Sequence, residues 1–227
     1  KIWEIGNRRY IMSTLIAPCA GLSSRYKKGK PKYLYTAPCG KPIFFLSLEK
    51  LLQFHDRVVF IILEEHEKKY NSKKIIYQCF KEYGFLKPEI IELKEVLNGP
   101  AFTVQYAIEY SDIKGPITIK DCDSICESNN YPISKNAVSF VDASKNNIER
   151  LSSKSSLEVD EHNKIISIKE KVIFSNYICA GIYFFQDVEL YISGFKNLIS
   201  LKSKKEMIIS HIIENLLLSS VAFLPHE

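Results

Sequence analysis

Short apolar runs alternate with helical segments in the first half of the chain, and this alternation restricts the possible folds. Residues 58–63 are continuously apolar and residues 14–17 nearly so, which is typical of strands that are covered on both faces. Helical patterns over 41–54 and 64–83 separate these strands from each other and from a third strand at 88–93. The order strand, helix, strand, helix, strand predicts an α/β fold with a parallel sheet and crossover helices.

The second half continues the pattern and adds a hairpin. Strands are predicted at 116–120, 136–141 and 180–185, helices at 101–110 and 206–218, and a hairpin at 156–168 with its turn at 161–163. The polar run 142–156 is expected to be a flexible excursion. We therefore predict a single three-layer α/β/α domain over residues 10–227 with a mixed, mainly parallel sheet. Residues 1–9 are expected to be an N-terminal extension or an expression remnant.

The amino-acid composition is that of an ordinary globular protein, and it argues against a membrane-spanning protein and a nucleic-acid-binding protein. Of 227 residues, 46% are apolar and 25% are charged. No apolar run approaches the roughly 20 residues that cross a bilayer. Much of the excess positive charge lies in one loop, which favours a phosphate-bearing ligand over a nucleic acid. Six cysteines without a CxxC pair, and no signal-peptide pattern, predict reduced thiols and a cytoplasmic location. The sequence does not determine the oligomeric state.

A basic loop follows the first predicted strand. The strand breaks at Pro18 into small residues, and five cations then lie between Arg25 and Lys32. Small residues let backbone N–H groups approach an anion, and flexible cations add charge for several phosphates at once. We therefore predict a nucleoside triphosphate site, with a solvated basic loop as the alternative. The residues expected to contact the nucleotide are Ala20, Gly21, Leu22, Ser23 and Ser24.

Two carboxylates follow the predicted strand at 116–120. Asp121 and Asp123 would repel each other at the end of a buried strand, and a cation would relieve this repulsion. A divalent ion such as Mg²⁺ binds one or two carboxylates together with phosphate oxygens. We therefore predict a Mg²⁺ cofactor held by Asp121 or Asp123, with Asp121 favoured because it directly follows the strand. A solvated acidic turn is the alternative.

The basic loop resembles the nucleotide-binding motif of the sugar-phosphate nucleotidyltransferases, a family with an A-type glycosyltransferase-like fold. In that family a strand is followed by Ala-Gly-x-Gly-x-Arg and, some residues later, by Pro-Lys. The matching residues are Ala20, Gly21, Arg25, Pro31 and Lys32, while Ser23 stands where the family has its second glycine. The resemblance implies two catalytic residues. Arg25 would hold the β- and γ-phosphates, and Lys32 would stabilise the α-phosphate or the attacking group.

Three later segments resemble the same family in the same order. Gly99 precedes a predicted helix, where the family has a glycine against the nucleotide base, and Asp121 stands where the family has an acidic Mg²⁺ ligand. Glu170 and Lys171 match a Glu-Lys pair before a strand of the type Gly-Ile-Tyr-x-Phe, here beginning at Gly181. The resemblance implies an acceptor site in which Glu170 holds hydroxyls and Lys171 holds the phosphate. Gly181 is assigned to the same site.

The implied reaction is nucleotidyl transfer from a nucleoside triphosphate to a phosphorylated small molecule, with release of pyrophosphate. The short chain resembles the compact cytidylyltransferases that activate phosphocholine or other small phosphorylated groups for bacterial surface polysaccharide. CTP is therefore favoured, with dTTP or UTP next. The expected acceptor is of the phosphocholine, phosphoglutamine or sugar 1-phosphate type, and the product would be a capsule-type precursor.

Two other functions stay open. Asp121-Cys122-Asp123 matches the DxD motif of metal-dependent A-type glycosyltransferases, which bind a nucleotide sugar but do not need the basic loop. The second alternative is a non-catalytic nucleotide-binding protein. It is favoured by Ser23 and by a second departure from the family, whose second metal-binding aspartate follows the last helix. No aspartate follows Asp187 in this sequence.

Overall fold

The computed structural model describes residues 3–5, 8–10, 12–21, 29–128, 130–146, 151–200 and 206–227. The helices are α1 (Ile43–Leu52), α2 (Glu64–Tyr70), α3 (Ser72–Glu82), α4 (Pro100–Tyr110), α5 (Val188–Ser200) and α6 (Ile209–Leu218), with 3₁₀ turns η1 (Lys32–Leu34) and η2 (Leu151–Ser153). The strands are β1 (Trp3–Ile5), β2 (Arg8–Tyr10), β3 (Thr14–Pro18), β4 (Arg57–Leu63), β5 (Glu89–Leu93), β6 (Ile117–Lys120), β7 (Ala137–Asp142), β8 (Ser155–Val159), β9 (Ile165–Glu170), β10 (Tyr177–Phe185) and β11 (Leu224–His226).

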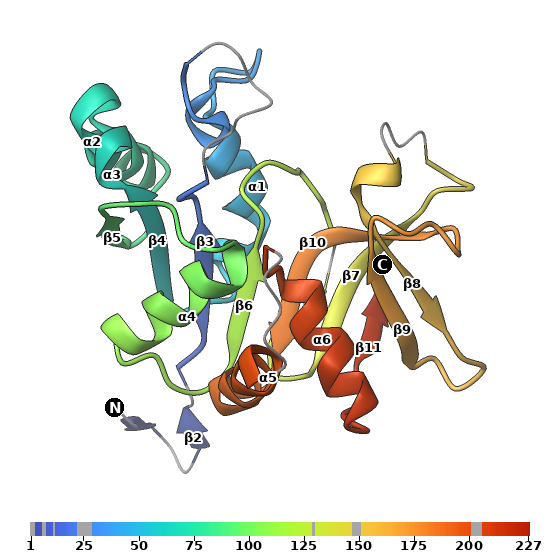
Figure 1. Cartoon of the computed structure of the whole chain (residues 1–227). Coiled ribbons are helices and arrows are strands. Elements are labelled where there is room, and N and C mark those ends of the chain that lie inside the picture. The colour runs from blue at the N-terminus through green and yellow to red at the C-terminus, as the bar shows by residue number, and fades with distance from the viewer. Residues whose placement is uncertain are drawn as a thin grey trace.

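One mixed sheet runs through the molecule in the order β11-β7-β10-β6-β3-β4-β5 (Figure 1). The strands β6, β3, β4 and β5 are parallel neighbours. The long strand β10 is antiparallel to β6, β7 and β8, and β8 pairs with β9 as the predicted hairpin. The predicted α/β class with a mixed sheet is therefore confirmed. Because β3 and β6 run in the same direction, their carboxyl ends reach the same edge, at the top of Figure 1.

Helices cover both faces of this sheet and enclose two apolar clusters. Strand residues alternate between the clusters, since Ile16 belongs to one and its neighbours Leu15 and Ala17 to the other. The first cluster includes residues of α4, α5 and α6, which lie in front of the sheet in Figure 1. The second cluster includes residues of α1 and α3. The strands at the centre are therefore buried on both sides, as their continuous apolar sequence predicts.

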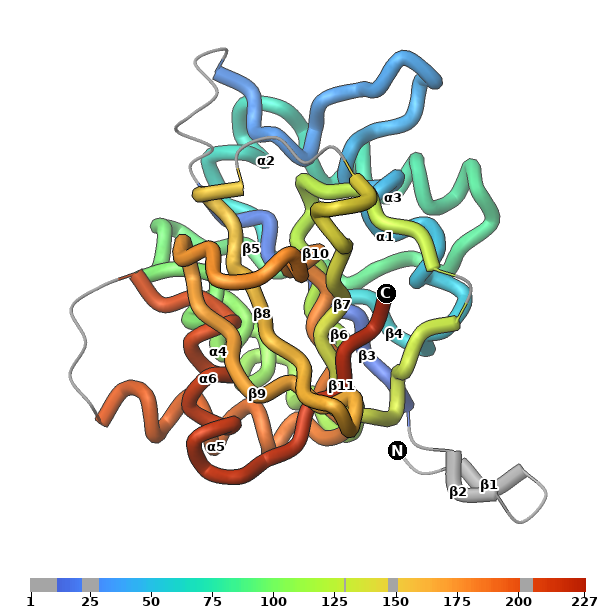
Figure 2. Tube along the Cα trace, turned by 90° about the vertical axis from the view of Figure 1, so that its right-hand side faces the viewer, coloured from blue at the N-terminus to red at the C-terminus, as the bar shows by residue number. Residues whose placement is uncertain are grey.

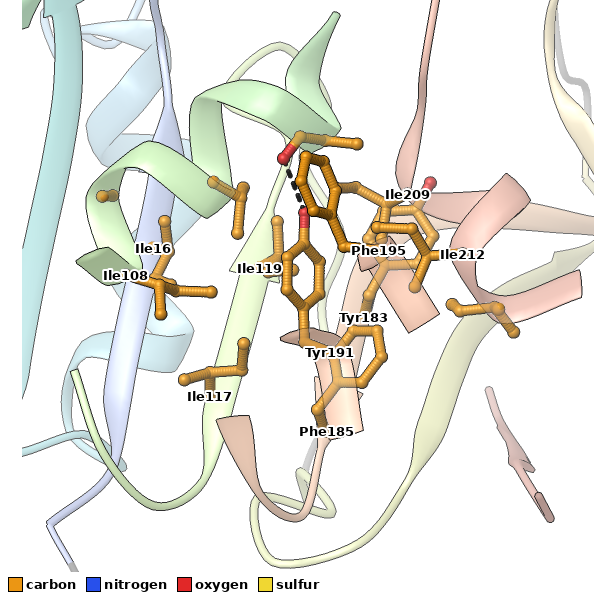
Figure 3. Packing of buried hydrophobic residues seen from close by; sticks show 14 of the residues in the cluster. Ile16, Ile108, Ile117, Ile119, Tyr183, Phe185, Tyr191, Phe195, Ile209 and Ile212 are labelled. Carbon is orange, nitrogen blue, oxygen red and sulfur yellow. Dashed lines mark hydrogen bonds between the residues drawn. The ribbon is translucent and has the colours of Figure 1, made fainter. Parts of the chain in front are cut away.

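Aromatic side chains anchor the helices of the first cluster (Figure 3). Tyr191 of α5 is fully buried, and its ring lies edge-on to Phe185 of β10 with ring centroids 5.3 Å apart. The Tyr191 hydroxyl donates a hydrogen bond of 2.8 Å to the backbone carbonyl of Ala101 in α4. This bond satisfies the polar tip of a buried aromatic side chain and joins α5 to α4, whose first turn borders the candidate site described below.

The helices differ from the sequence prediction in two regions. The helix expected over 64–83 is two helices, α2 and α3, separated at Asn71, which has a left-handed backbone with φ of 52°. Asparagine tolerates this conformation, and the Glu67 carboxylate accepts a 2.7 Å hydrogen bond from the Lys73 N–H at the start of α3. Helix α5 was not assigned bounds from the sequence, although Val188, Tyr191 and Phe195 repeat at helical spacing and are buried.

The far side of the sheet carries the hairpin and the last strand. Figure 1 shows β8 and β9 near β7 and β11, at the opposite end of the sheet from β5, and Figure 2 views the molecule from that side. Strand β11 runs parallel to β7, and neither β11 nor the pairing of β1 with β2 follows from the sequence patterns. Among the described helices, none combines the length and apolar character needed to cross a membrane. All six cysteines are free thiols, in agreement with the prediction.

Candidate active site

The basic loop and the acidic strand end meet at the shared edge of β3 and β6. Lys32 follows the basic loop, and its Nζ donates a hydrogen bond of 2.9 Å to Oδ2 of Asp123, 91 positions later in the chain. The side chains are 24% and 41% exposed. Two motifs that are far apart in the sequence therefore form one charged site, because both follow parallel strands.

A polar cavity of about 160 Å³ adjoins this ion pair. It lies between the end of β6, the start of α4, the first residues of β8 and the bulged middle of β10. The side chains and backbone that matter for the chemistry below are Asp121, Asp123, Lys154, Glu170, Gly181 and Tyr183. The structure thus brings residues of the acidic motif, the Glu-Lys motif and the Gly-Ile-Tyr strand to one cavity.

Asp121 is held against the backbone of β10. Its N–H donates a 2.9 Å hydrogen bond to the carbonyl of Gly181, which has a left-handed backbone with φ of 73°. A Cβ atom at position 181 would lie 2.6 Å from Oδ2 of Asp121, well inside van der Waals contact. Glycine is therefore required at position 181 both by the backbone conformation and by the space that Asp121 occupies.

The surroundings of Asp121 destabilise the charged form of its carboxylate. Burial raises the pKa of Asp121 to about 6, and the negative charges of Asp123 and Glu170 act in the same direction. The positive charges of Lys120 and Lys154 oppose this rise in pKa. Among the described residues, no donor forms a hydrogen bond with the Asp121 carboxylate. A buried carboxylate with this environment is typical of a functional site that binds a cation.

Lys120 lies behind the acidic residues and organises their loop. Its side chain is fully buried at the end of β6. The Nζ donates hydrogen bonds to the carbonyl of Asp121 at 2.6 Å, and to the carbonyl and hydroxyl oxygens of Ser124 at 2.8 Å each. All three donors of the ammonium group thus have a partner within four residues, so the charge is compensated by oxygen atoms of the same loop.

Asp123 has a different environment. Burial raises its pKa, but the hydrogen bond and charge of Lys32 outweigh this effect and leave the pKa below its ordinary value. Lys154 and Lys120 add to the lowering. Asp123 is therefore an ionised carboxylate that lines the cavity, with a partly exposed side chain paired with Lys32.

The two carboxylates fit a hard divalent cation. Asp121 and Asp123 provide oxygen ligands on one cavity, and the Asp121 carboxylate has no hydrogen-bond donor among the described residues. Within the described part of the chain, no group of three or more histidine, cysteine or acidic side chains forms a metal cluster. Two carboxylates on one cavity could hold Mg²⁺, which uses few protein ligands and completes its shell with water and phosphate oxygens.

Of the Glu-Lys pair, Glu170 lines the cavity and Lys171 lies outside it. Glu170 is 22% exposed, lines the cavity, and accepts a 2.5 Å hydrogen bond from the hydroxyl of Ser155. Lys171 has a left-handed backbone with φ of 56°, and its side chain is 64% exposed, with Nζ 3.8 Å from Oε1 of Glu170. Lys171 is not among the residues that line the cavity.

Gly99 is packed against the segment that leads into α6. Its φ is 99°, and a Cβ atom there would lie 2.2 Å from the carbonyl oxygen of Met207. That carbonyl accepts a 3.1 Å hydrogen bond from the N–H of Ala101, and the Met207 N–H donates a 3.0 Å bond to Asn98. The next residue, Pro100, lines the cavity. Close backbone packing therefore explains the glycine, and its predicted contact with a base stays a prediction.

The basic loop is described only at its two ends. Ala20 is buried and Gly21 is exposed directly after β3, at the edge where β6 ends. The other predicted nucleotide contacts, Leu22, Ser23 and Ser24, lie outside the described residues, as does Arg25. Of the two predicted catalytic residues, the structure therefore describes Lys32.

Three residues of the site were not predicted from the sequence. Lys154 and Ser155 fall in the polar run that was expected to be a flexible excursion, but the described part of this run forms η2 and the start of β8. Lys120 ends an otherwise apolar strand, where a lysine usually points to solvent. The available signal was its position directly before two aspartates, which a buried cation would stabilise.

Comparisons with known proteins agree on the fold. The nucleoside-diphosphate-sugar pyrophosphorylase from Vibrio cholerae RC9 is 21% identical, with a TM-score of 0.77 and coverage of 93% of this chain and 91% of that chain. The inositol-1-phosphate CTP transferase from T. maritima is 16% identical, with a TM-score of 0.69 and coverage of 94% and 84%. A UDP-glucose pyrophosphorylase complexed with UDP-glucose is 12% identical, with a TM-score of 0.70 and coverage of 95% and 90%.

At these identities the similarity shows a common fold. No model of a protein family matches the sequence, and a search of curated proteins found no significant match.

Proposed function

We propose that this protein is a nucleotidyltransferase that transfers a nucleoside monophosphate from a nucleoside triphosphate to a phosphorylated small molecule. The observation that carries the proposal is the contact between Lys32 and Asp123. It joins the end of a basic loop suited to a triphosphate with a carboxylate suited to Mg²⁺, beside a polar cavity that includes Glu170. A site of this kind can hold two phosphate-bearing substrates next to each other.

In the proposed reaction, a phosphate oxygen of the acceptor attacks the α-phosphorus of the triphosphate. A new P–O bond forms, the bond between the α-phosphorus and the bridging oxygen breaks, and pyrophosphate leaves with the electron pair. Little covalent chemistry is required of the protein, which must align two anions and stabilise developing charge. Lys32 would stabilise the α-phosphate or the attacking group, and Arg25 would hold the leaving phosphates. Asp121 and Asp123 would hold Mg²⁺, which neutralises phosphate charge when bound.

The remaining predicted residues would bind the two organic parts of the substrates. Ala20, Gly21 and Gly99 would contact the nucleotide through their backbone, together with residues 22–24. Glu170 would accept hydrogen bonds from acceptor hydroxyls, and Gly181, which lines the same cavity, would contact the acceptor through its backbone. Lys171 would approach the acceptor phosphate from the exposed side of Glu170.

We propose CTP as the triphosphate, with dTTP or UTP next, and an acceptor of the phosphocholine, phosphoglutamine or sugar 1-phosphate type. The support is the resemblance of this compact chain to cytidylyltransferases, together with the shared fold of an inositol-1-phosphate CTP transferase. The product would be an activated precursor for cell-surface polysaccharide, made in the cytoplasm.

A thermal-shift panel followed by a pyrophosphate-release assay tests the proposal. CTP, UTP, dTTP, GTP, ATP and UDP-sugars are each added with and without Mg²⁺. A ligand at about 100 times its Kd adds roughly 2.7 kcal/mol to the free energy of unfolding, which is a measurable shift. We expect one pyrimidine triphosphate to stabilise the protein in a Mg²⁺-dependent way and to release pyrophosphate when a phosphorylated acceptor is present.

The variant Lys32→Met separates catalysis from binding. We expect turnover to fall by about 100-fold or more, because one preorganised charge at the reacting phosphate is lost. Lys114→Met, which removes an exposed lysine that does not line the cavity, is the control and should retain most activity. Stabilisation by a UDP-sugar alone would instead indicate a glycosyltransferase, and triphosphate binding without turnover would indicate a non-catalytic nucleotide-binding protein.

A further inference from the structure

A lysine that the family resemblance does not predict lies in the cavity beside Asp121. Lys154 follows η2 and directly precedes β8, and its half-buried side chain lines the same cavity as Asp121 and Glu170. Its backbone is fixed at both polar atoms. The N–H of Lys154 donates to the carbonyl of Leu151 at 2.9 Å, and its carbonyl accepts a 3.0 Å bond from the N–H of Lys171.

The hairpin determines which of these two lysines lines the cavity. Ser155 is paired with Glu170 in the register of β8 and β9, so Lys154 and Lys171 are the next residues beyond the pair. The left-handed backbone at Lys171 lies at the end of β9, and its side chain is 64% exposed. Lys154 lines the cavity instead, together with both predicted metal ligands.

The other lysines near the cavity already have protein partners. Lys32 is bonded to Asp123, and Lys120 is buried with three oxygen partners. For Lys154, no carboxylate of the described residues lies within ion-pair distance, although its charge lowers the pKa of Asp121 and of Asp123. Within the described part of the chain, Lys154 is therefore a positive charge without a carboxylate at short range.

We infer that Lys154 is the principal cation that binds the phosphate of the acceptor, in the cavity between Asp121 and Glu170. The inference rests on the proposed function and names a residue for it that no family motif assigns. An acceptor phosphate that approaches Asp121 and Asp123 is repelled by two carboxylates, and a lysine ammonium inside the cavity offsets this repulsion with up to three hydrogen bonds. Lys171, on the exposed side of Glu170, would contribute less because solvent screens its charge.

Isothermal titration calorimetry on matched variants tests this assignment. The probes are inorganic phosphate, glucose 1-phosphate, inositol 1-phosphate and phosphocholine for the acceptor site, and CTP with Mg²⁺ for the nucleotide site. Lys154→Met and Lys171→Met remove one charge each from adjacent positions of the hairpin, and Lys154→Arg keeps the charge. Thermal melting of each variant checks the fold, which should persist because the Lys154 ammonium has no partner among the described residues.

We expect Lys154→Met to weaken binding of the phosphate probe by at least about 10-fold and Lys171→Met by less than about 3-fold, with the Kd for CTP changed little in either. Lys154→Arg should restore most of the affinity, which a merely structural role of the side chain would not predict. Unchanged phosphate affinity in Lys154→Met, or a larger loss in Lys171→Met, would overturn the inference.

The outcomes also separate this inference from the proposed function. If the wild-type protein binds CTP with Mg²⁺ but none of the phosphate probes, the inference fails and the nucleotide half of the proposal stands. If the protein binds a phosphate probe through Lys154 but binds none of the triphosphates, the assignment of Lys154 stands and nucleotidyl transfer fails.

Discussion

The two carboxylates of the acidic loop, two residues apart, have opposite environments. The backbone of Asp121 accepts a hydrogen bond from the buried ammonium of Lys120 and donates one to the carbonyl of Gly181. Burial raises the pKa of its carboxylate to about 6. Asp123 is 41% exposed, paired with Lys32, and has a lowered pKa, because that partner outweighs the effect of burial. The inner carboxylate is therefore fixed by the fold, whereas the outer carboxylate is held by one exchangeable ion pair.

The largest change in the free energy of unfolding is expected when a side chain at position 181 takes the space of the Asp121 carboxylate. Gly181→Ala adds a Cβ atom 2.6 Å from Oδ2 of Asp121 at a left-handed position. Strain of about 1–2 kcal/mol and overpacking of about 1–3 kcal/mol should together lower the free energy of unfolding by roughly 2–5 kcal/mol. Urea denaturation measures this change, and the affinity for Mg²⁺ or Mn²⁺ should fall because Asp121 is displaced.

Gly84→Ala is the control for backbone strain alone. Gly84 has a similar φ of 75°, and no atom lies within 4 Å of the added Cβ. Its loss of stability should be about 1–2 kcal/mol, the contribution of backbone strain alone. Equal losses in the two variants would contradict the view that Gly181 makes room for Asp121.

The next effect concerns the buried cation behind the loop. Lys120→Met leaves the Asp121 carbonyl and Ser124 without their donor, which should reduce the free energy of unfolding by about 2 kcal/mol. Mn²⁺ affinity, measured by electron paramagnetic resonance, should also fall because the loop loses its internal support. The control is Lys114→Met, whose side chain is 75% exposed and pairs with Asp112, and it should change stability by less than about 1 kcal/mol.

An effect of opposite sign is expected at Asp121 itself. Its folded-state pKa of about 6 exceeds the ordinary value of 3.8, so the folded state binds the additional proton between these pH values. The stability that protonation provides is complete below about pH 4 and is lost as the pH rises through 6. Asp121→Asn should therefore be more stable than the wild type at pH 7 and should lose Mg²⁺-dependent stabilisation.

Urea denaturation of this pair of proteins at pH 4, 5, 6 and 7 checks the sign of the effect. The stability difference in favour of Asp121→Asn should grow between pH 4 and pH 6 and remain constant above pH 6. A wild type that is the more stable protein at pH 7 in the absence of metal would contradict a destabilising inner carboxylate.

The smallest effect is expected for the outer carboxylate. Asp123→Asn removes a partly exposed ion pair with Lys32, and the free energy of unfolding should change by no more than about 1 kcal/mol. Under the proposed function, the dependence of activity on Mg²⁺ should nevertheless weaken, because one of the two proposed metal ligands is lost. A loss of stability comparable to that of Gly181→Ala would show that both carboxylates are structural, and the contrast between them would disappear.

Local patterns in the sequence were sufficient for the central elements of the fold. The apolar runs of β3 and β4 are buried on both faces, because crossover helices cover a parallel sheet from both sides. The same parallel arrangement brings the basic loop and the acidic pair to one edge, where Lys32 contacts Asp123. The sequence predicts the buried strands and the shared edge because hydrophobic periodicity and the order of the elements can be read from residues that are neighbours in the chain.

Side-chain direction and strand register were decided only by the tertiary structure. The burial of Lys120, the contact of Gly181 with Asp121, and the position of Lys154 in the cavity all depend on pairing between segments that are distant in the sequence. A lysine in a polar run has the same local pattern whether it faces solvent or a cavity. Its environment is determined by the β8–β9 register and by the bulge in β10, which no local pattern specifies.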